Sequence, residues 1–378
     1  MRSSQRGLRP PRRTAAGDGA AAHAAELHRK AIVIDCHSDI LMPIADGLVR
    51  LGTQVAIPDP AHWKPPFELV GNPSYDYGWP LNDYFGCIGQ YSLPQFVAGG
   101  LTAQVCAIFV EDHQLDRALR RSLEMVYWLH REAKDNAGFE IVRTVADIHR
   151  LKREGQCGGI LALEGLEPLG QDLKLLDLFY ELGLRMASLT HNRRNYFADG
   201  TQHHVKTGGL TDMGKQAVRR MNEMGIVVDV GHIDQAGFLE TLEICTAPVV
   251  LSHRSPRKFF PLKAEDSPLH PGYDVSRGRE RLEALARNGG VFGVFFLDNK
   301  SVDDVIADIE YVIELVGPDH VGLGSDLYGL QTAPEGLEDM SKVPVLTERL
   351  VQRGHSDEVI LKFLGGNFMR VFEQAWRA

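Results

Sequence analysis

Short apolar segments of strand type recur eight times along this chain, and helical segments separate most of them. The eight begin near residues 32, 101, 159, 186, 226, 248, 291 and 320. Helices are predicted where apolar side chains recur every three or four residues, as they do over 116–134. Strands that alternate with helices predict a parallel sheet with crossover connections. Eight such repeats predict an α/β fold closed into a (β/α)8 TIM barrel, with an open doubly wound sheet as the alternative.

Ligand-type side chains follow many of these strands. His37 and Asp39 come after the first apolar run, two residues apart, so a strand would aim both at one point. Later runs end on or just before five further residues, namely Glu164, His191, His232, His253 and Asp326. Because all strands of a parallel barrel end at one mouth, we expect these seven side chains to meet there.

Such a set of donors indicates a metal centre. Four histidines and three carboxylates, with no cysteine among them, suit Zn²⁺ and similar ions. Seven donors also exceed what one catalytic zinc takes, so two metal ions are expected. A nucleotide cofactor is not indicated, because Gly322-Leu323-Gly324 lacks the third glycine and the acid of a dinucleotide fingerprint.

Composition excludes several other classes of protein. The net charge of -9 over 378 residues gives no support to nucleic-acid binding. No apolar run reaches the roughly 18 residues of a membrane span, so no membrane partner is expected. The five cysteines are scattered without CxxC spacing, which favours a reducing cytoplasm over a disulfide framework.

Residues 1–24 differ from the rest of the chain. Five arginines lie among Ser, Pro, Gly and Ala, with no acid before Asp18. This pattern predicts a disordered basic arm, with an organelle address as the alternative and no export signal. Residues 25–378 are predicted to form one barrel domain. Within it, the Pro-rich and aromatic stretch 59–90 is expected to be either a lid over the site or a surface excursion.

Several motifs in order resemble the membrane dipeptidase (renal dipeptidase) family of the amidohydrolase superfamily. They are Ile34-Asp-Cys-His-Ser-Asp39, Glu164-Gly165, Leu189-Thr-His-Asn192, Gly209-Leu-Thr-Asp-Met-Gly214, Asn222 through His232, Ser252-His253, Gly322-Leu-Gly-Ser-Asp326 and Gly366-Asn367 with Arg370. The resemblance runs from about Ile34 to the end of the chain. It implies a metallopeptidase that hydrolyses the amide bond of dipeptides, including those with a C-terminal D-residue.

The resemblance also implies a role for each site residue. His37 and Asp39 would bind one zinc ion, His232 and His253 the second, and Glu164 would bridge the two together with a hydroxide. Asp326 would be the catalytic acid and base. His191 would contact the substrate carbonyl. Both chemical roles agree with the needs of amide hydrolysis.

The substrate end of the site departs from the family. The family has an arginine after the second metal-binding histidine for the substrate carboxylate, but the segment 254–279 is rearranged and Pro-rich here. Arg257, Arg277 and Arg279 are candidates, and Arg277 is favoured. Two alternative functions follow: another amidohydrolase activity on the same metals, such as an N-acyl amino acid hydrolase or lactonase, or a catalytically idle metal-binding protein. The family also implies a homodimer.

Overall fold

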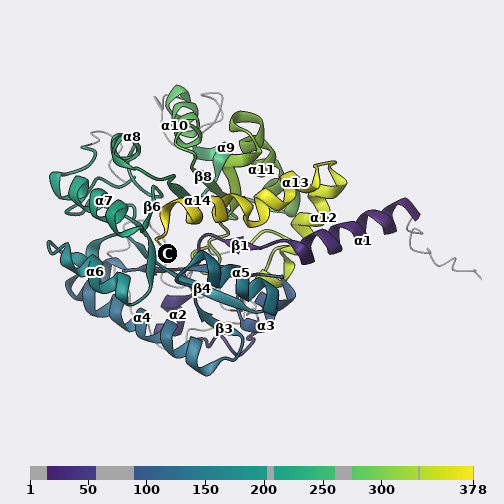
Figure 1. Ribbon diagram of the computed structural model, residues 1–378, viewed down its shortest axis with the longest axis horizontal. Helices are drawn as coiled ribbons and strands as arrows, with labels where there is room; N and C mark the ends of the chain where they lie inside the picture. Colours follow the sequence, from purple (N-terminus) through teal and green to yellow (C-terminus); the bar gives the residue numbers. More distant parts are fainter. Residues whose placement is uncertain (1–14, 57–88, 202–207, 260–274, 331–332, 378) are drawn as a thin grey trace, which may run out of the picture.

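The computed structural model describes residues 15–56, 89–201, 208–259, 275–330 and 333–377. Within these ranges all strands pair in parallel, and eight of them close into a ring (Figure 1). The pairing of β2 with β4 closes the ring, so the structure is the TIM barrel and not the open sheet. The eight strands, in chain order, are β1 (Ile34–Asp35), β2 (Ala103–Phe109), β4 (Cys157–Glu164), β5 (Leu184–Ser188), β6 (Val227–Asp229), β7 (Val250–Arg254), β8 (Val291–Val294) and β9 (Val321–Leu323).

One further strand was not predicted. β3 (Phe139–Ile141) pairs with the first residues of β4, Cys157–Gly159, whereas β5 pairs with β4 only from Leu161 onward. β3 therefore extends the same edge of β4 toward its amino end. Three residues are too few to show a periodic pattern, which is why the sequence did not indicate this strand.

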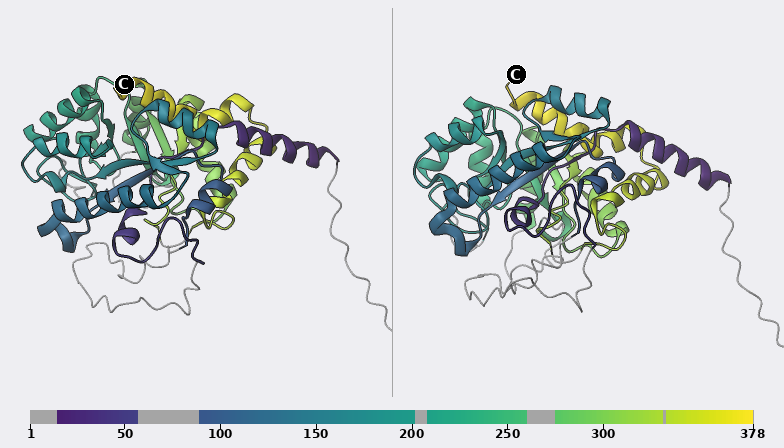
Figure 2. Two further views of the ribbon diagram at one scale, coloured as in Figure 1. Left: turned by 60° about the horizontal axis from the view of Figure 1, so that its bottom comes forward. Right: turned by 90° about the horizontal axis from the view of Figure 1, so that it is seen from below.

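Helices surround the barrel (Figures 1 and 2). The amphipathic helix α4 buries Met125, Val126 and Leu129, and α7 is capped by Thr211, whose hydroxyl accepts from the N–H of Gly214. The helices are α1 (Ala15–Lys30), α2 (Leu41–Ala45), α3 (Leu93–Ala98), α4 (Ala118–Asp135), α5 (Val145–Glu154), α6 (Lys174–Glu181), α7 (Asp212–Met224), α8 (Gln235–Ile244), α9 (Pro256–Phe259), α10 (Val275–Arg287), α11 (Val302–Val316), α12 (Pro344–Gln352), α13 (Asp357–Leu361) and α14 (Asn367–Ala375).

Helix α1 projects away from the barrel (Figures 1 and 2). The sequence placed 15–24 in a disordered arm, but these residues are helical, because alanine has the highest helix propensity and dominates this stretch. The helix is attached by His28, whose ring contacts Thr347 at 2.7 Å and the carbonyl of Gly99 at 2.8 Å. Residues 1–14 and most of the stretch 59–90 lie outside the described residues, so those expectations stay predictions.

Helix α14 closes the amino-terminal end of the barrel. Its aromatic side chains Phe368, Phe372 and Trp376 join the apolar cluster that fills the barrel interior. The side chain of Asn367 donates to the carbonyl of Val321, and Arg370 donates to the carbonyl of Gly289. One end of the barrel is thus sealed by apolar packing, and polar side chains are left to the other end.

Of the helices within the described ranges, none is both long and apolar enough to cross a membrane.

Candidate metal centre

The seven predicted side chains meet at the carboxyl ends of the strands. Each lies within a strand end or within four residues beyond it, on β1, β4, β5, β6, β7 and β9. They are His37, Asp39, Glu164, His191, His232, His253 and Asp326. These strands carry apolar residues inside the barrel and are followed by polar residues at their carboxyl ends. The polar groups that meet there lie up to 289 positions apart in the chain.

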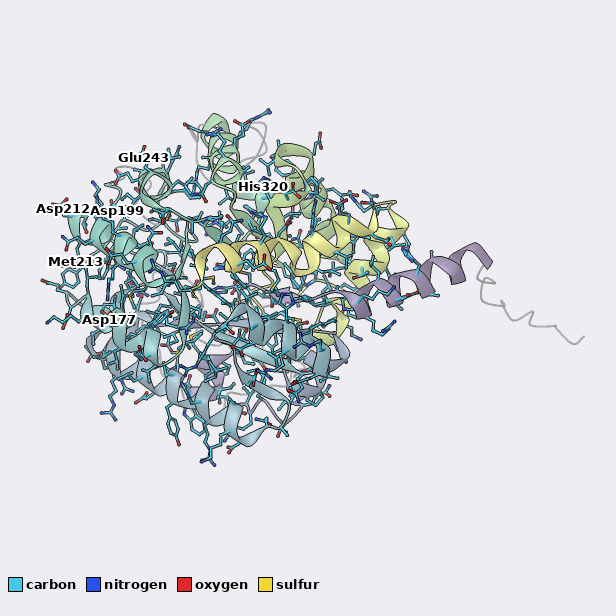
Figure 3. All side chains as sticks on the ribbon, viewed as in Figure 1. Asp177, Asp199, Asp212, Met213, Glu243 and His320 are labelled. Atoms are coloured by element: carbon cyan, nitrogen blue, oxygen red, sulfur yellow. The ribbon has the colours of Figure 1, made fainter. Side chains whose placement is uncertain are left out.

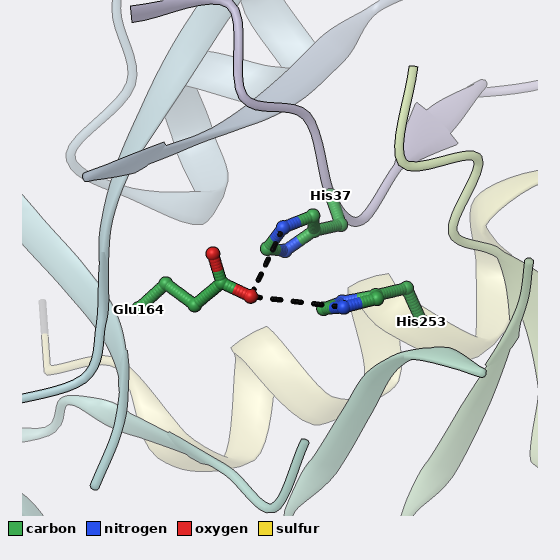
Figure 4. Close-up of side chains that lie close together, drawn as sticks. All are labelled: His37, Glu164 and His253. Carbon is green, nitrogen blue, oxygen red and sulfur yellow. Dashed lines mark ion pairs between the residues drawn. The ribbon is translucent and has the colours of Figure 1, made fainter. Parts of the chain in front are cut away.

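Glu164 lies at the centre of the cluster. Its Oε1 atom is 3.5 Å from His37 Nε2, 3.2 Å from His232 Nε2 and 3.7 Å from His253 Nε2. Figure 4 shows this carboxylate between the rings of His37 and His253. One oxygen shared by imidazoles from three strands is the arrangement expected of a carboxylate that serves two metal ions.

Two buried polar atoms of the cluster have no hydrogen-bond partner among the described residues. They are Nε2 of His37 and Oδ1 of Asp39, on residues that are 2% and 6% exposed. Leaving a polar atom buried without a partner costs about 1–3 kcal/mol. Buried ligand atoms without a hydrogen-bond partner are typical of a site that binds an ion.

The rings of His232 and His253 give the strongest indication of a cation. Their Nε2 atoms are 2.7 Å apart. The Nδ1 atom of His232 lies 2.7 Å from Asn192 Oδ1, which can only accept, so this nitrogen carries the proton. The Nδ1 atom of His253 lies 2.9 Å from the Ser252 hydroxyl, whose own proton goes to the Asp229 carboxylate. Both Nε2 atoms therefore present lone pairs to each other, and a bound cation relieves that repulsion.

The carboxyl groups of the cluster have raised pKa values. Burial raises the pKa of Asp39 to about 7, and the charge of Glu111 adds to the effect. Burial also raises the pKa of Glu164 and of Asp326, and the nearby Asp39 charge raises both further. Three crowded carboxylates are thus costly without a positive charge between them.

The histidines shift the other way. Burial lowers the pKa of His37 to about 3. Burial likewise lowers the pKa of His191, His232 and His253 well below the ordinary value. The site therefore holds neutral imidazoles, the form that binds metal ions, and these rings do not supply the positive charge that the carboxylates require. Divalent cations fit both the neutral imidazoles and the crowded carboxylates of this donor set.

Three overlapping subsets of donors lie close enough to share an ion. They are His37 with Glu164 and His253, Glu164 with His191 and His232, and His37 with Asp39 and Asp326. Glu164 and His37 each belong to two subsets. The three subsets therefore form one continuous cluster of metal-binding donors.

The two predicted catalytic residues border the donors. Asp326 Oδ1 lies 3.5 Å from His37 Nε2, and the backbone φ of Asp326 is 57°, in the left-handed region. Such a conformation is strained for a residue with a side chain and is found at functional sites. The ring of His191 packs 4.3 Å from that of His232 and 4.4 Å from that of Phe109, measured between centroids.

Two of the three arginines predicted to bind the substrate carboxylate form ion pairs elsewhere. Arg257 binds Asp308, and Arg279 binds Glu283 at 2.8 Å on an exposed helix face. Arg277 lies on α10, but its side chain is outside the described residues. By contrast Arg254, the residue after His253 on β7, is close enough for its charge to lower the pKa of His191, His232 and His253.

Sequence reasoning gave no role to the residues that hold the histidine rings. Asn192 holds His232, and Ser252 with Asp229 holds His253. One signal was available: Asp229 interrupts the apolar run Ile226–Val230, and an acid within a buried strand needs hydrogen-bond partners. Which partners it has depends on the neighbouring strand, which the sequence does not specify.

Other histidines have structural roles. His320, labelled in Figure 3, lies at the amino-terminal end of β9 and contacts the carbonyl of Gly290 at 2.8 Å. His320, at the start of a strand, thus contacts a backbone carbonyl, whereas the histidines of the metal centre, at strand ends, face one another.

Known proteins share this sequence and fold. Residues 21–378 match the family described as Membrane dipeptidase (Peptidase family M19). Dipeptidase aclJ from Aspergillus oryzae is 31% identical over 311 residues, which cover 77% of this chain and 71% of that protein. The probable dipeptidase PvdM from Pseudomonas aeruginosa superposes with a TM-score of 0.74 at 22% identity, over 95% of this chain and 98% of that one.

A third relative was solved with a ligand. It is a metallopeptidase from Rhodobacter sphaeroides bound to a phosphinate mimic of the dipeptide L-Ala-D-Ala, with a TM-score of 0.72 and 23% identity. The alignment covers 92% of this chain and 99% of that one. At these identities the two solved structures support the barrel fold.

Proposed function

The chain belongs to the membrane dipeptidase family and is a metal-dependent dipeptidase; on that premise we propose that it works with two zinc ions at the mouth of the barrel. The observation that carries the proposal is the pair of Nε2 lone pairs on His232 and His253, 2.7 Å apart beside Glu164. Imidazole and carboxylate donors without thiolate suit zinc. His37 with Asp39 would hold one ion, His232 with His253 the other, and Glu164 both.

Two bound zinc ions would supply Lewis-acid polarisation of the substrate carbonyl and a lowered pKa for the attacking water. The protein's own residues would handle the proton. Asp326 borders the donor cluster, and it would accept a proton from the water and deliver it to the leaving amine. Its strained left-handed backbone supports this role, because the turn keeps the carboxyl group at the mouth of the barrel.

His191 would stabilise the developing oxyanion. Its lowered pKa keeps the imidazole neutral, so one ring nitrogen carries a proton that it can donate to the substrate oxygen. Its packing against Phe109 and His232 holds the ring in place for that contact. The presence of both His191 and Asp326 beside the donors speaks against a catalytically idle protein.

The free carboxylate of the dipeptide would bind Arg254. Arg254 follows His253 directly in the sequence. Its positive charge lowers the pKa of three imidazole rings of the site. Loss of a charge-assisted hydrogen bond costs about 1.5–3 kcal/mol, or roughly 10- to 100-fold in KM. Arg254→Gln should raise KM by that factor for dipeptides and not for dipeptide amides, and Arg279→Gln should change neither.

Dipeptides with a D-residue at the C-terminal side are included in the proposal. The Rhodobacter relative binds a mimic of L-Ala-D-Ala, which supports a site that accepts this stereochemistry. The test is turnover by the purified, zinc-loaded protein of L-L and L-D dipeptides, N-acyl amino acids and lactones, with metal content measured on the same sample. Two metal ions with cleavage of dipeptides support the proposal. Two ions with cleavage of only N-acyl amino acids or lactones overturn the substrate class.

A homodimer and a cytoplasmic location complete the proposal. Exposed apolar side chains of Leu115, Leu123 and Tyr127 line a groove of about 930 Å³ beside α4, and such patches favour association. The four cysteines in the described ranges are free thiols, as expected in a reducing compartment. Light scattering after gel filtration tests the dimer, and cell fractionation tests the location.

A further inference from the structure

Two buried aspartates bind two serines in the same way, in two strand pairs of the barrel that are separated by β8. The Asp229 carboxylate accepts from Ser252 twice, from the backbone N–H at 3.0 Å and from the hydroxyl at 2.6 Å. The Asp35 carboxylate accepts from Ser325 in the same two places, at 2.8 and 2.6 Å. All four residues are at most 3% exposed. We call these two pairs the β6–β7 clamp and the β1–β9 clamp.

The register of the strands is also the same in the two clamps. Asp229 pairs with Val250 on β7, and Asp35 pairs with Leu323 on β9. In each clamp the serine is the second residue after that partner. Each serine also immediately precedes a residue of the site, His253 in one clamp and Asp326 in the other.

We propose that the two clamps are positioning devices with different outputs: the β6–β7 clamp sets the tautomer of His253 for metal binding, and the β1–β9 clamp sets the backbone turn that carries Asp326. The inference rests on the proposed metal centre. It adds residues that act through His253 and Asp326 and do not themselves touch metal or substrate.

The first output follows from hydrogen-bond donors and acceptors. The Asp229 carboxylate accepts only, so the Ser252 hydroxyl donates its single proton to it. The Ser252 oxygen is then an acceptor toward His253 Nδ1, at 2.9 Å, and this ring nitrogen must carry the proton. The other nitrogen, Nε2, is left with a lone pair directed at Glu164 and His232. Ordinarily a metal-binding histidine is oriented directly by a carboxylate or carbonyl, and here a hydroxyl relays the effect.

The second output is on the backbone. The N–H of Ser325 is held by Asp35, and the Ser325 hydroxyl oxygen accepts from the N–H of Leu327 at 3.3 Å. Asp326 is therefore bracketed by hydrogen bonds on both sides, in its left-handed conformation with φ of 57°. Tyr91 reinforces this clamp, since its hydroxyl donates to Asp35 at 2.9 Å.

Replacing each aspartate by asparagine separates the two outputs. In Asp229→Asn the side-chain amide donates to the Ser252 oxygen, so the serine proton turns toward His253 Nδ1 and the ring proton moves to Nε2. The same reversal of tautomer is known for the aspartate-to-asparagine change in a catalytic triad. In Asp35→Asn no imidazole follows the serine, so no tautomer changes and only the turn at Asp326 loosens.

The experiment measures the tautomer and metal affinity of wild type, Asp229→Asn and Asp35→Asn at pH 8. Nitrogen-15 NMR of histidine rings in the metal-free protein, with His253→Gln to assign the signal, should show the proton on Nδ1 in wild type and on Nε2 in Asp229→Asn. Equilibrium dialysis with zinc should show 10- to 100-fold weaker binding of one ion in Asp229→Asn. Asp35→Asn should keep zinc affinity within about 3-fold of wild type and lower kcat with KM unchanged.

Two results would overturn the inference. One is an unchanged His253 tautomer and zinc affinity in Asp229→Asn; the other is an equal loss of zinc affinity in both variants, which would indicate a merely structural role. If circular dichroism shows either variant unfolded, the milder pair Ser252→Ala and Ser325→Ala is compared in the same two assays. Zinc binding with the predicted tautomers but no dipeptide cleavage would refute the proposed substrate and leave the clamps standing.

Discussion

Gly324 lies so close to the backbone carbonyl of Ser252 that a Cβ atom at position 324 would overlap the carbonyl oxygen. Gly293 contacts the same carbonyl from β8. Ser252 precedes His253, and Gly324 lies two residues before Asp326, so this contact joins two parts of the metal centre across β8. The glycine spacing at 322–324, which is no nucleotide fingerprint, thus has a packing explanation.

Gly324→Ala should therefore destabilise the fold and weaken metal binding. A methyl group here forces a backbone shift of β7 or β9, at a cost of about 1–3 kcal/mol or more, and displaces His253 with Ser252. Thermal unfolding with and without zinc, together with zinc affinity, checks the prediction. Gly19→Ala is the control: Gly19 lies in helix α1 with nothing within 4 Å of the added atom, and the change should stabilise by about 0.5–1 kcal/mol. Unaltered stability in Gly324→Ala would contradict the packing argument.

Asp326→Asn should keep both metal ions and lose most turnover. An amide has nearly the same shape as the carboxylate but does not accept and release a proton, and general acid–base groups contribute about 10²- to 10⁴-fold to rate. The measurement is kcat together with metal content by atomic absorption. Normal kcat in this variant would rule out the role assigned to Asp326.

His232→Ala and Asn192→Ala should both weaken metal binding, and the loss should be larger in His232→Ala. Removing the His232 ring takes away a ligand and should lower metal content toward one ion per chain. Removing Asn192 leaves the ring but not the acceptor at 2.7 Å that orients it, which should weaken one zinc by about 10- to 100-fold. Asn288→Ala is a matched control, because its Oδ1 accepts from the N–H of Val249 at the other end of β7. Zinc affinity should not change in that variant, and an equal loss there would show a general effect.

Removal of the metal should make stability depend on pH in a predictable direction. Burial raises the pKa of Asp39 from 3.8 to about 7 in the folded protein, so its contribution to stability is present below about pH 4 and is lost as the pH rises through 7. His37 has the opposite sign: its pKa falls from 6.5 to about 3, so its contribution is present above 6.5 and is lost as the pH falls toward 3. Between pH 8 and 7 the Asp39 contribution changes most, because the His37 contribution falls mainly as the pH approaches and passes below 6.5.

Because burial raises the pKa of Asp39, Glu164 and Asp326, the chelated protein should gain thermal stability as the pH falls from 8 to 7. The zinc-loaded protein should instead lose stability as protons compete for the ligands. Unfolding curves at three pH values with chelator or zinc measure both trends. Asp39→Asn removes one of the three carboxyl groups with a raised pKa and should reduce the pH dependence of the chelated protein. A chelated wild type whose stability rises with pH over this range would contradict the assignment.

Much of the site could be predicted because strand ends are local features. An apolar run that stops at His37, Glu164 or Asp326 can be read from neighbouring residues, and the parallel barrel then requires these ends to meet. The strand β3 was not predicted, since three residues leave no period, and the helix at 15–24 was predicted as disorder, since its alanines carry no amphipathic pattern.

The sequence by itself determined the alternation of strands and helices, the family and the donors at the mouth, because each depends on residue type and spacing along the chain. Only the tertiary structure decided that Asp229 binds Ser252 and that Gly324 packs against the same serine. These are relations between strands, set by register and closure of the barrel. A register fixes partners dozens or hundreds of positions apart, and no local pattern carries that information.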